Sequence, residues 1–149
     1  MDRYNVNKSI AHYINGNSIL LGLLMKRKLD PLRITWQQLA VLMACSDEGG
    51  TCTVTEIASL LVTDLPSATR LVDRLSKKGF IARKRSELDR RSVLCTITAE
   101  GRKILRRGAS VREQVLSASL TPLTTHEQQT LQKLLTKLMS HLEQASSAN

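Results

Sequence analysis

The stretch LPSATRLVDRLSKKGFIARKRSELDRRSVLCTIT, residues 65–98, carries the clearest structural pattern in the chain. In its first half, apolar residues recur at i, i+3, i+4 and i+7, which predicts an amphipathic helix from Pro66 to Lys78. Pro66 suits the first turn of a helix, and Gly79 suits the left-handed position that ends one. In its second half, FIARKR and SVLCTIT have the composition of short β-strands. They predict a hairpin whose strands are linked by residues 86–91.

Five further helices are predicted outside this stretch. They cover residues 9–29, 35–46, 54–62, 99–120 and 125–144. Thr35 and Thr98 are placed to cap the second and fourth of these helices. The third helix is expected to bury Ile57, Leu60 and Leu61. Two short helices followed by a hairpin make a winged helix-turn-helix, so the expected class is mainly α with a small β-wing (α+β).

The positive charge of the chain is concentrated in one part of it. The whole chain carries +9, and residues 70–107 contain thirteen Lys or Arg against four Asp or Glu, which accounts for all of that charge. A charge confined in this way is typical of a protein that binds a polyanion. Because aromatic residues make up only 3% of the chain, stacking on single-stranded bases is disfavoured. Double-stranded DNA is therefore the expected partner.

The polar face of the 66–78 helix carries the candidates for reading bases. A major groove admits one helix, in which Arg can bridge guanine O6 and N7 while Ser and Thr reach bases or phosphates. We assign Ser67, Thr69 and Arg70 to base contacts. The cations farther along are assigned to phosphates, and they are Arg74, Lys77 and Lys78. An ordinary surface helix would show the same division of faces, and the basic hairpin beside it favours DNA binding.

The hairpin supplies a second set of candidates. Its basic residues include Arg83, Arg85, Arg90 and Arg91. A narrow minor groove has an enhanced negative potential that attracts inserted Arg, so Arg90 and Arg91 at the tip suit such a groove. Asp89 is interpreted as an intramolecular partner that orients an Arg. The alternative is a solvated, charged hairpin tip.

The run TRLVDRLSKKGFI and the triplet Asp89-Arg90-Arg91 resemble the MarR family of bacterial transcriptional regulators, and the resemblance extends over residues 8–143. It implies that residues 66–78 form the recognition helix, that Arg91 enters the minor groove and that Asp89 supports it. The run SATR and the preceding Pro66 depart from the usual STVTR-like pattern of the family, which leaves the base preference open.

The resemblance also implies a homodimer joined by the first helix and the last two. The candidate dimer residues are Ile10, Ile14, Leu131, Leu134, Leu135, Leu138 and Leu142. The leucine-rich seam of the last helix is too apolar for a solvent-facing helix, so it packs in the core or meets its copy. A dimer predicts a pseudo-palindromic DNA site. We therefore expect one domain over 1–149, with a DNA-binding lobe at 35–98 and a helical dimerisation region at 8–30 and 99–145.

A small-molecule effector pocket between the dimer helices and the DNA-binding lobe is a further implication of the resemblance. His12, Tyr13 and Trp36 are the candidates to line it, although a single Trp at a helix start also fits the core. Cys45, Cys52 and Cys95 match no metal-ligand spacing. They are interpreted as reduced thiols, either core-filling residues or a redox sensor.

Other classes of protein find little support in the sequence. The motifs HExxH, GxSxG, GxGxxG and the P-loop are missing, so neither an enzyme nor a cofactor or metal site is expected. No apolar run is long enough to span a membrane and no secretory signal is present, which predicts a cytoplasmic protein. The remaining alternative is a sequence-tolerant, nucleoid-type DNA-binding protein, which the charge alone would permit.

Overall fold

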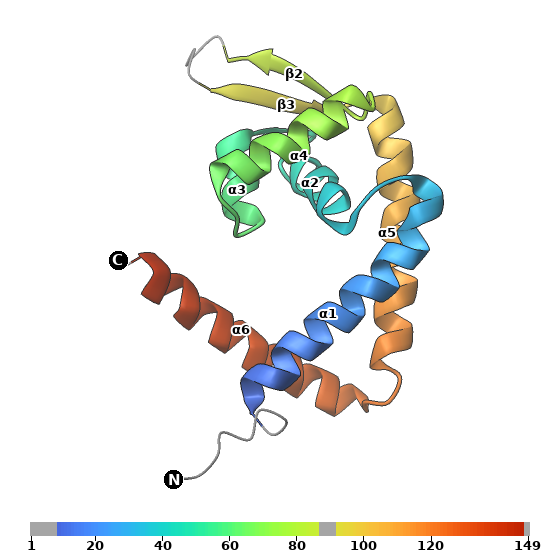
Figure 1. The fold of residues 1–149 in the computed structure, drawn as a ribbon, viewed down its shortest axis with the longest axis vertical. Helices are drawn as coiled ribbons and strands as arrows, with labels where there is room; N and C mark the ends of the chain where they lie inside the picture. Colours follow the sequence, from blue (N-terminus) through green and yellow to red (C-terminus); the bar gives the residue numbers. More distant parts are fainter. Residues whose placement is uncertain (1–8, 87–91, 148–149) are drawn as a thin grey trace. The chain divides into compact units, whose positions relative to one another are not determined.

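The computed structural model describes residues 9–86 and 92–147, which form helices and one small sheet (Figure 1). The elements are α1 (Ile10–Leu29), the 3-10 helix η2 (Asp30–Leu32), α2 (Trp36–Asp47), β1 (Thr51–Thr53), α3 (Val54–Leu60), α4 (Leu65–Lys77), β2 (Ile81–Arg85), β3 (Val93–Ile97), α5 (Ala99–Leu120) and α6 (Thr125–Ser147). The chain divides into two compact units, Met1–Val115 and Leu116–Asn149. The predicted mainly α class with a β-wing is confirmed.

The sheet has three antiparallel strands in the order β1-β3-β2. Its register pairs Cys52 with Cys95, and Arg83 with Cys95 from the other side. The sequence predicted β2 and β3 but not β1. A three-residue strand is too short to show a period, and β1 forms because it pairs with a strand more than 40 residues away.

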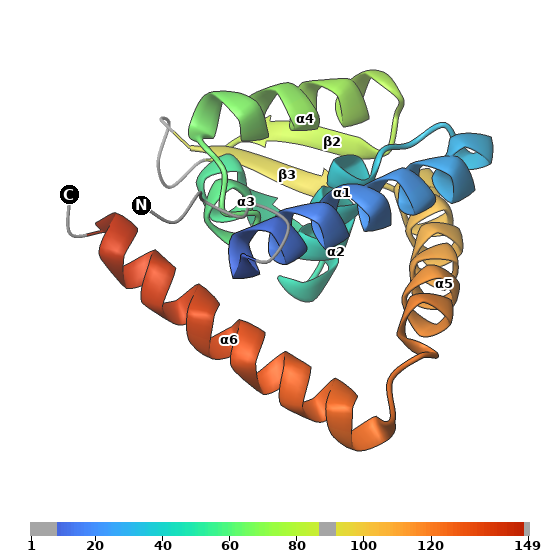
Figure 2. The ribbon, with the colours of Figure 1, turned by 60° about the horizontal axis from the view of Figure 1, so that its bottom comes forward.

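The core of the winged helix-turn-helix is built on the apolar stripe of α4. Ala68, Val72 and Leu75 are fully buried, and Leu71 packs against the same cluster. Residues from α2, α3 and the sheet complete this core; they include Val41, Leu42, Cys45, Ile57, Ile81, Cys95 and Ile97. Burial of one such large aliphatic side chain stabilises a fold by about 1.5–3 kcal/mol. The stripe therefore fixes which face of α4 is turned outward, and α4 lies along β2 (Figure 2).

One inward residue was predicted wrongly on α3. Ile57 is buried and Leu61 packs on the core, but 52% of Leu60 is exposed. The helix ends at Leu60, and the backbone then turns through Val62, whose φ is 49°. Because the helical period stops there, the spacing no longer determines which side chains point inward.

A second apolar cluster joins the end of α1 to η2, α2 and α5. It contains the buried residues Met25, Leu29, Leu32, Ile34, Leu39 and Val115. Earlier on α1 Leu21 packs against this cluster, but most apolar side chains are exposed, and 77% of Ile10 and 62% of Leu20 are accessible. No helix among the described residues is long and apolar enough to cross a membrane.

The second unit contains the last residues of α5 together with α6. The N-terminus of α6 is held by a reciprocal pair of contacts, in which Thr124 N–H donates to Glu127 and Glu127 N–H donates to Thr124 Oγ1. The apolar side chains of α6 are exposed, namely Leu131, Leu134, Leu135, Leu138, Met139 and Leu142. The predicted leucine seam is therefore a surface of this helix.

Gly101 in α5 is a position where only glycine fits. A Cβ there would overlap the carbonyl oxygen of Phe80 and lie 2.9 Å from Ile97 Cγ1. Since both neighbours belong to the core of the winged lobe, we expect Gly101→Ala to lower the free energy of unfolding by about 1–3 kcal/mol. Gly16→Ala, with no atom within 4 Å of its Cβ, should instead be neutral or stabilise α1 by up to about 1 kcal/mol. Urea denaturation at one protein concentration measures both, and equal effects would contradict this account of Gly101.

Candidate nucleic-acid interface

Helix α4 (Leu65–Lys77) is capped by Asp64 at its start and is followed by the left-handed Gly79 at its end. The Asp64 carboxylate accepts a hydrogen bond of 2.7 Å from Ser67 N–H, which makes Asp64 the N-cap and places Pro66 in the first turn. At the other end, Gly79 has φ 73°, the left-handed conformation predicted for it. The place of Pro66 in the first turn and the end of the helix at Gly79 agree with the sequence prediction.

Helices α3 and α4 form the helix-turn-helix. They pack against each other through the common core, and the four residues between them include Val62 and the N-cap Asp64. Because the apolar stripe of α4 faces this core, its opposite face carries the exposed cations Arg70, Arg74 and Lys77. The side chains of Arg74 and Lys77 have no hydrogen-bond or ion-pair partner among the described residues. They are free to bind phosphates.

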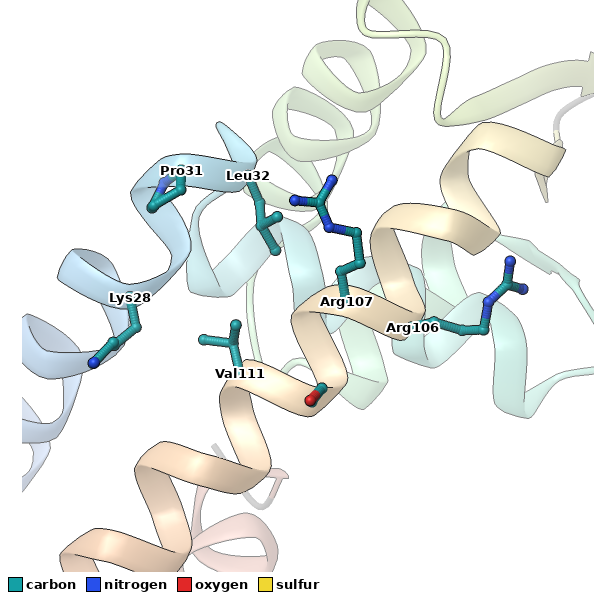
Figure 3. Close-up of a pocket in the computed structure, with 7 residues that line it drawn as sticks. Lys28, Pro31, Leu32, Arg106, Arg107 and Val111 are labelled. Carbon is teal, nitrogen blue, oxygen red and sulfur yellow. The ribbon is translucent and has the colours of Figure 1, made fainter.

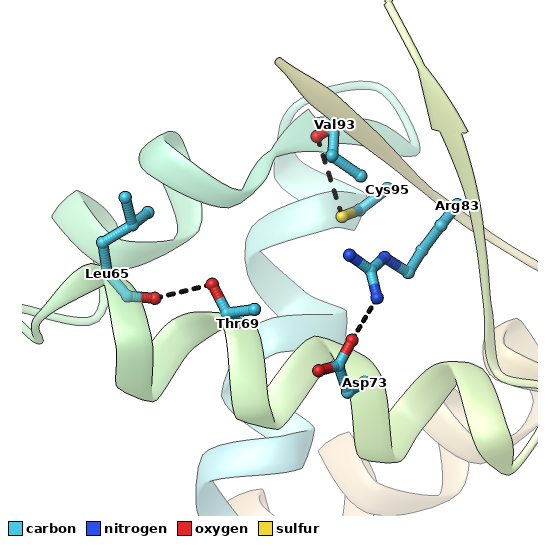
Figure 4. A network of polar contacts seen from close by, with 6 residues as sticks. All are labelled: Leu65, Thr69, Asp73, Arg83, Val93 and Cys95. Carbon is cyan, nitrogen blue, oxygen red and sulfur yellow. Dashed lines mark hydrogen bonds and ion pairs between the residues drawn. The ribbon is translucent and has the colours of Figure 1, made fainter. Parts of the chain in front are cut away.

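The three predicted base-reading residues lie together at the N-terminal end of α4. Ser67 Oγ donates to Asp64 Oδ2 at 2.9 Å and accepts from Arg70 Nη2 at 2.8 Å. Thr69 Oγ1 donates to the carbonyl oxygen of Leu65 at 2.8 Å (Figure 4). Arg70 is therefore held by a neighbouring side chain, while Thr69 is engaged with its own helix.

The wing is attached to α4 by an ion pair. Figure 4 shows Arg83 reaching from β2 to Asp73 on α4. The two side chains keep 34% and 42% of their surface exposed, so the pair orients more than it stabilises. Arg85, at the end of β2, is exposed. The predicted tip residues Asp89, Arg90 and Arg91 lie outside the described residues.

The side chain of Lys78 forms contacts within the protein that the sequence did not predict. Its Nζ donates to the carbonyl oxygen of Arg33 at 2.6 Å and to Gln38 Oε1 at 3.0 Å. Gln38 also accepts from Thr35 N–H in the capping box that begins α2. This lysine thus joins the end of the recognition helix to the start of α2, whereas the sequence assigned it to phosphate binding. The sequence did not predict these contacts, because the partners of Lys78 are 40 and 45 residues away along the chain.

The three cysteines are buried in the core of the winged lobe. Burial raises the pKa of Cys95 to about 11, so its thiol stays protonated at neutral pH. A hydrogen bond to Cys52, together with burial, raises the pKa of Cys45 above its ordinary value. The environments of Cys45 and Cys95 are those of core-filling thiols, whereas the hydrogen bond to Cys45 lowers the pKa of Cys52. Within residues 9–86 and 92–147, no group of His, Cys, Asp and Glu is arranged to hold a metal ion.

The predicted effector residues are only partly brought together. Trp36 lines a hollow of about 340 Å³ between α1 and the start of α2, beside Ile19, Leu23 and Thr35. The guanidinium of Arg112 lies over the Trp36 ring, 5.8 Å from its centroid. His12 and Tyr13 do not line this hollow. They contact each other edge to face, with ring centroids 5.6 Å apart.

A second hollow of about 500 Å³ lies between η2 and α5 (Figure 3). Pro31, Leu32 and Val111 supply its apolar surface, and Lys28, Arg106, Arg107 and Ser110 supply its polar groups. None of the three cations has a hydrogen-bond or ion-pair partner in the described part of the chain. Sequence reasoning missed this hollow, because its two walls come from segments that lie far apart in the chain.

Comparison with known proteins agrees with this architecture. The sequence model of the MarR family matches residues 34–93. The multiple antibiotic resistance protein MarR of Escherichia coli is 37% identical over 118 residues, which cover 78% of this chain and 81% of that protein. The chain belongs to the MarR family.

One further relative and one solved structure support the membership of this chain in the MarR family. An uncharacterised HTH-type transcriptional regulator of Bacillus subtilis, YfiV, is 37% identical over 79% of this chain and 71% of its own length. The crystal structure of a mutant MarR from Escherichia coli complexed with operator DNA superposes with a TM-score of 0.84 at 29% identity, covering 93% of this chain and 99% of that one. The predicted class, a DNA-binding transcriptional regulator with a winged helix, is confirmed.

The internal role of Lys78 can be tested against Lys77, its exposed neighbour in this MarR-family protein. We expect Lys78→Met to lower the free energy of unfolding by about 1 kcal/mol, since it removes two hydrogen bonds from a charged but solvent-accessible donor. Lys77→Met should change it by less than about 0.5 kcal/mol. Chemical denaturation followed by circular dichroism gives both values. Equal stabilities of the two variants would disprove a stabilising role for the hydrogen bonds of Lys78.

Proposed function

We propose that two copies of this chain bind a pseudo-palindromic DNA duplex, with α4 of each copy in a major groove. The observation that carries the proposal is the outer face of α4. It presents Arg70, Arg74 and Lys77 in a row, on a helix whose opposite face is locked into the core. The crystal structure of the related Escherichia coli MarR, which is complexed with operator DNA, supports DNA binding by this chain.

The residues divide into three roles. Arg70 reads bases, because it lies near the end of the helix that enters the groove first, and Ser67 and Thr69 lie beside it. Arg74 and Lys77 hold phosphates. The wing residues Arg83 and Arg85 extend the basic surface, and the tip is proposed to reach the minor groove with Arg90 and Arg91, oriented by Asp89. The tip assignments rest on the sequence alone.

Dimerisation is proposed to use the exposed apolar side chains of α1 and α6. Ile10 and Ile14 are 77% and 42% exposed on α1, and the seam of α6 leaves 39–60% of each leucine exposed. Exposed apolar side chains at this density are typical of a surface that another protein covers. We therefore propose residues 35–98 as the DNA-binding lobe and residues 8–30 and 99–145 as the dimerisation region.

The protein is proposed to act by binding rather than by catalysis, and to do so in the cytoplasm. Its relatives are transcriptional regulators. Cys45 and Cys95 are buried thiols that stay protonated and are poor nucleophiles, which argues against covalent catalysis by these two residues. A sequence-tolerant nucleoid protein would share the basic surface, so the measured preference for one DNA sequence must separate the two functions.

DNA binding is tested by fluorescence anisotropy with a duplex from upstream of the protein's own gene and a shuffled duplex, at several salt concentrations. We expect tight, saturable binding to the first that persists at physiological salt. Arg74→Ala should reduce the dependence of log K on log salt by about 0.9 for each phosphate that Arg74 neutralises. Arg27→Ala, which removes an exposed cation of α1, is the matched control and should leave the slope unchanged. If the affinity for both duplexes is equal, binding sites are next selected from the whole genome. Equal affinity for all of those sequences would favour the nucleoid function.

We also propose that an organic anion with an apolar body acts as an effector and binds the hollow between η2 and α5. Arg107, whose guanidinium lies between α5 and Leu32 in Figure 3, can neutralise its charge while Leu32, Pro31 and Val111 contact its apolar part. A ligand of this kind lowers DNA affinity only if it prefers a protein geometry that cannot span both half-sites.

Calorimetric titration with benzoate and with neutral benzamide tests this effector site. We expect benzoate to bind and benzamide to bind more weakly, because only the first can pair with a cation. Arg107→Gln should weaken benzoate binding by about tenfold or more, the loss of one charge-assisted hydrogen bond. The Arg102→Gln variant, changed on the same helix but outside the hollow, should bind benzoate with the affinity of the unmodified protein. Equal binding of both compounds would exclude an anion site here.

A further inference from the structure

Three residues at the start of α4 form a chain of hydrogen bonds. Asp64 Oδ1 accepts from Ser67 N–H at 2.7 Å and Asp64 Oδ2 accepts from Ser67 Oγ at 2.9 Å. Ser67 Oγ in turn accepts from Arg70 Nη2 at 2.8 Å. The spacing is i, i+3, i+6, which places the three side chains along one side of the first two turns.

The direction of each bond is fixed by the number of protons available. A serine hydroxyl has one proton, and here that proton goes to the carboxylate of Asp64. Its oxygen is then oriented to accept from Arg70. The N–H of Ser67, its hydroxyl and the positive charge of Arg70 all lower the pKa of Asp64, so the carboxylate stays ionised and keeps its role as acceptor at neutral pH.

This arrangement distinguishes Arg70 from the other cations on the same face of α4. The side chains of Arg74 and Lys77 have no polar partner among the described residues, and the hydroxyl of Thr69 is bound to the carbonyl oxygen of Leu65. Of the five N–H donors of Arg70, only one takes part in the hydrogen bonds to Ser67 and Asp64. The remaining donors can still form a fork with a base, and their direction is set before DNA arrives.

We propose that Asp64 and Ser67 are positioning residues that aim Arg70 at one guanine in each half-site, and that Ser67 itself reads no base. Arg pairs with guanine through O6 and N7 when its planar fork lies in the plane of the base. An unrestrained arginine has many rotamers that bring it near a phosphate instead. The chain of hydrogen bonds therefore gives specificity at one position of the site. This inference rests on the proposed placement of α4 in the major groove.

The test begins with an operator obtained from randomised duplexes by selection with the unmodified protein. Affinity is then measured for every single-base variant of one half-site. Arg70→Ala identifies the position that Arg70 reads, because discrimination disappears there. At that same position, Ser67→Ala should lose about tenfold in discrimination, the lower range of one bidentate contact. Its affinity for a shuffled duplex and its salt slope should not change.

Three further variants separate positioning from a merely structural effect. Ser67→Thr keeps the hydroxyl and should retain discrimination. Ser76→Ala makes the same change near the other end of α4 and should behave as the unmodified protein. The double variant Ser67→Ala, Arg70→Ala should discriminate no worse than Arg70→Ala alone, because the serine acts only through the arginine.

Each result is decisive. Full discrimination by Ser67→Ala would overturn the inference, and so would a loss at a position other than that of Arg70, since Ser67 would then read its own base. If the unmodified protein prefers no sequence at all, the proposed function fails and the inference fails with it. If the unmodified protein discriminates and Ser67→Ala does so equally, only the inference is lost.

Discussion

The burial of one side of α4 is the constraint on which the rest of this structure depends. Ala68, Val72 and Leu75 are completely removed from solvent against α2, α3 and the sheet. A rotation of α4 about its axis by one residue, about 100°, would expose this stripe and bury charged side chains, which is far more costly than any surface contact could offset. The outward direction of Arg70 and Arg74 is therefore a consequence of core packing.

The junction after α4 transmits this constraint to the wing and to α5. Phe80 N–H donates to the carbonyl oxygen of Leu75, and Thr98 N–H donates to the carbonyl oxygen of Phe80. Thr98 Oγ1 donates to the carbonyl oxygen of Gly79 at 2.7 Å and accepts from Gly101 N–H at 3.0 Å. The end of the recognition helix, the base of the hairpin and the first turn of α5 thus share a few backbone groups. Gly101 is required there because α5 approaches the chain too closely for a side chain.

The sequence predicted those features that depend on local periodicity or local capping. The α4 stripe, the Thr35 and Thr98 caps and the turn at Gly79 were all predicted, because each needs only a few neighbouring residues. What depends on distant partners was missed, as in the pairing of β1 with β3 and the clamp of Lys78 on Arg33. The contacts among Asp64, Ser67 and Arg70 could be predicted only in part. Their i, i+3 spacing was visible, but the direction of each hydrogen bond required the structure.

The acids on and beside α4 are expected to favour specificity over affinity for DNA. Two acids lie on or beside a helix that is proposed to approach phosphates, and an acid there weakens every DNA complex, whatever its sequence. Both acids are engaged with a cation or its support: Asp73 binds Arg83 of the wing, and Asp64 holds Ser67 against Arg70. Repulsion from phosphates is independent of sequence, so both carboxylates are expected to lower nonspecific binding. The proposed support of Arg70 by Asp64 and Ser67 benefits only the matching base, and we expect it to raise the ratio between the correct site and all others.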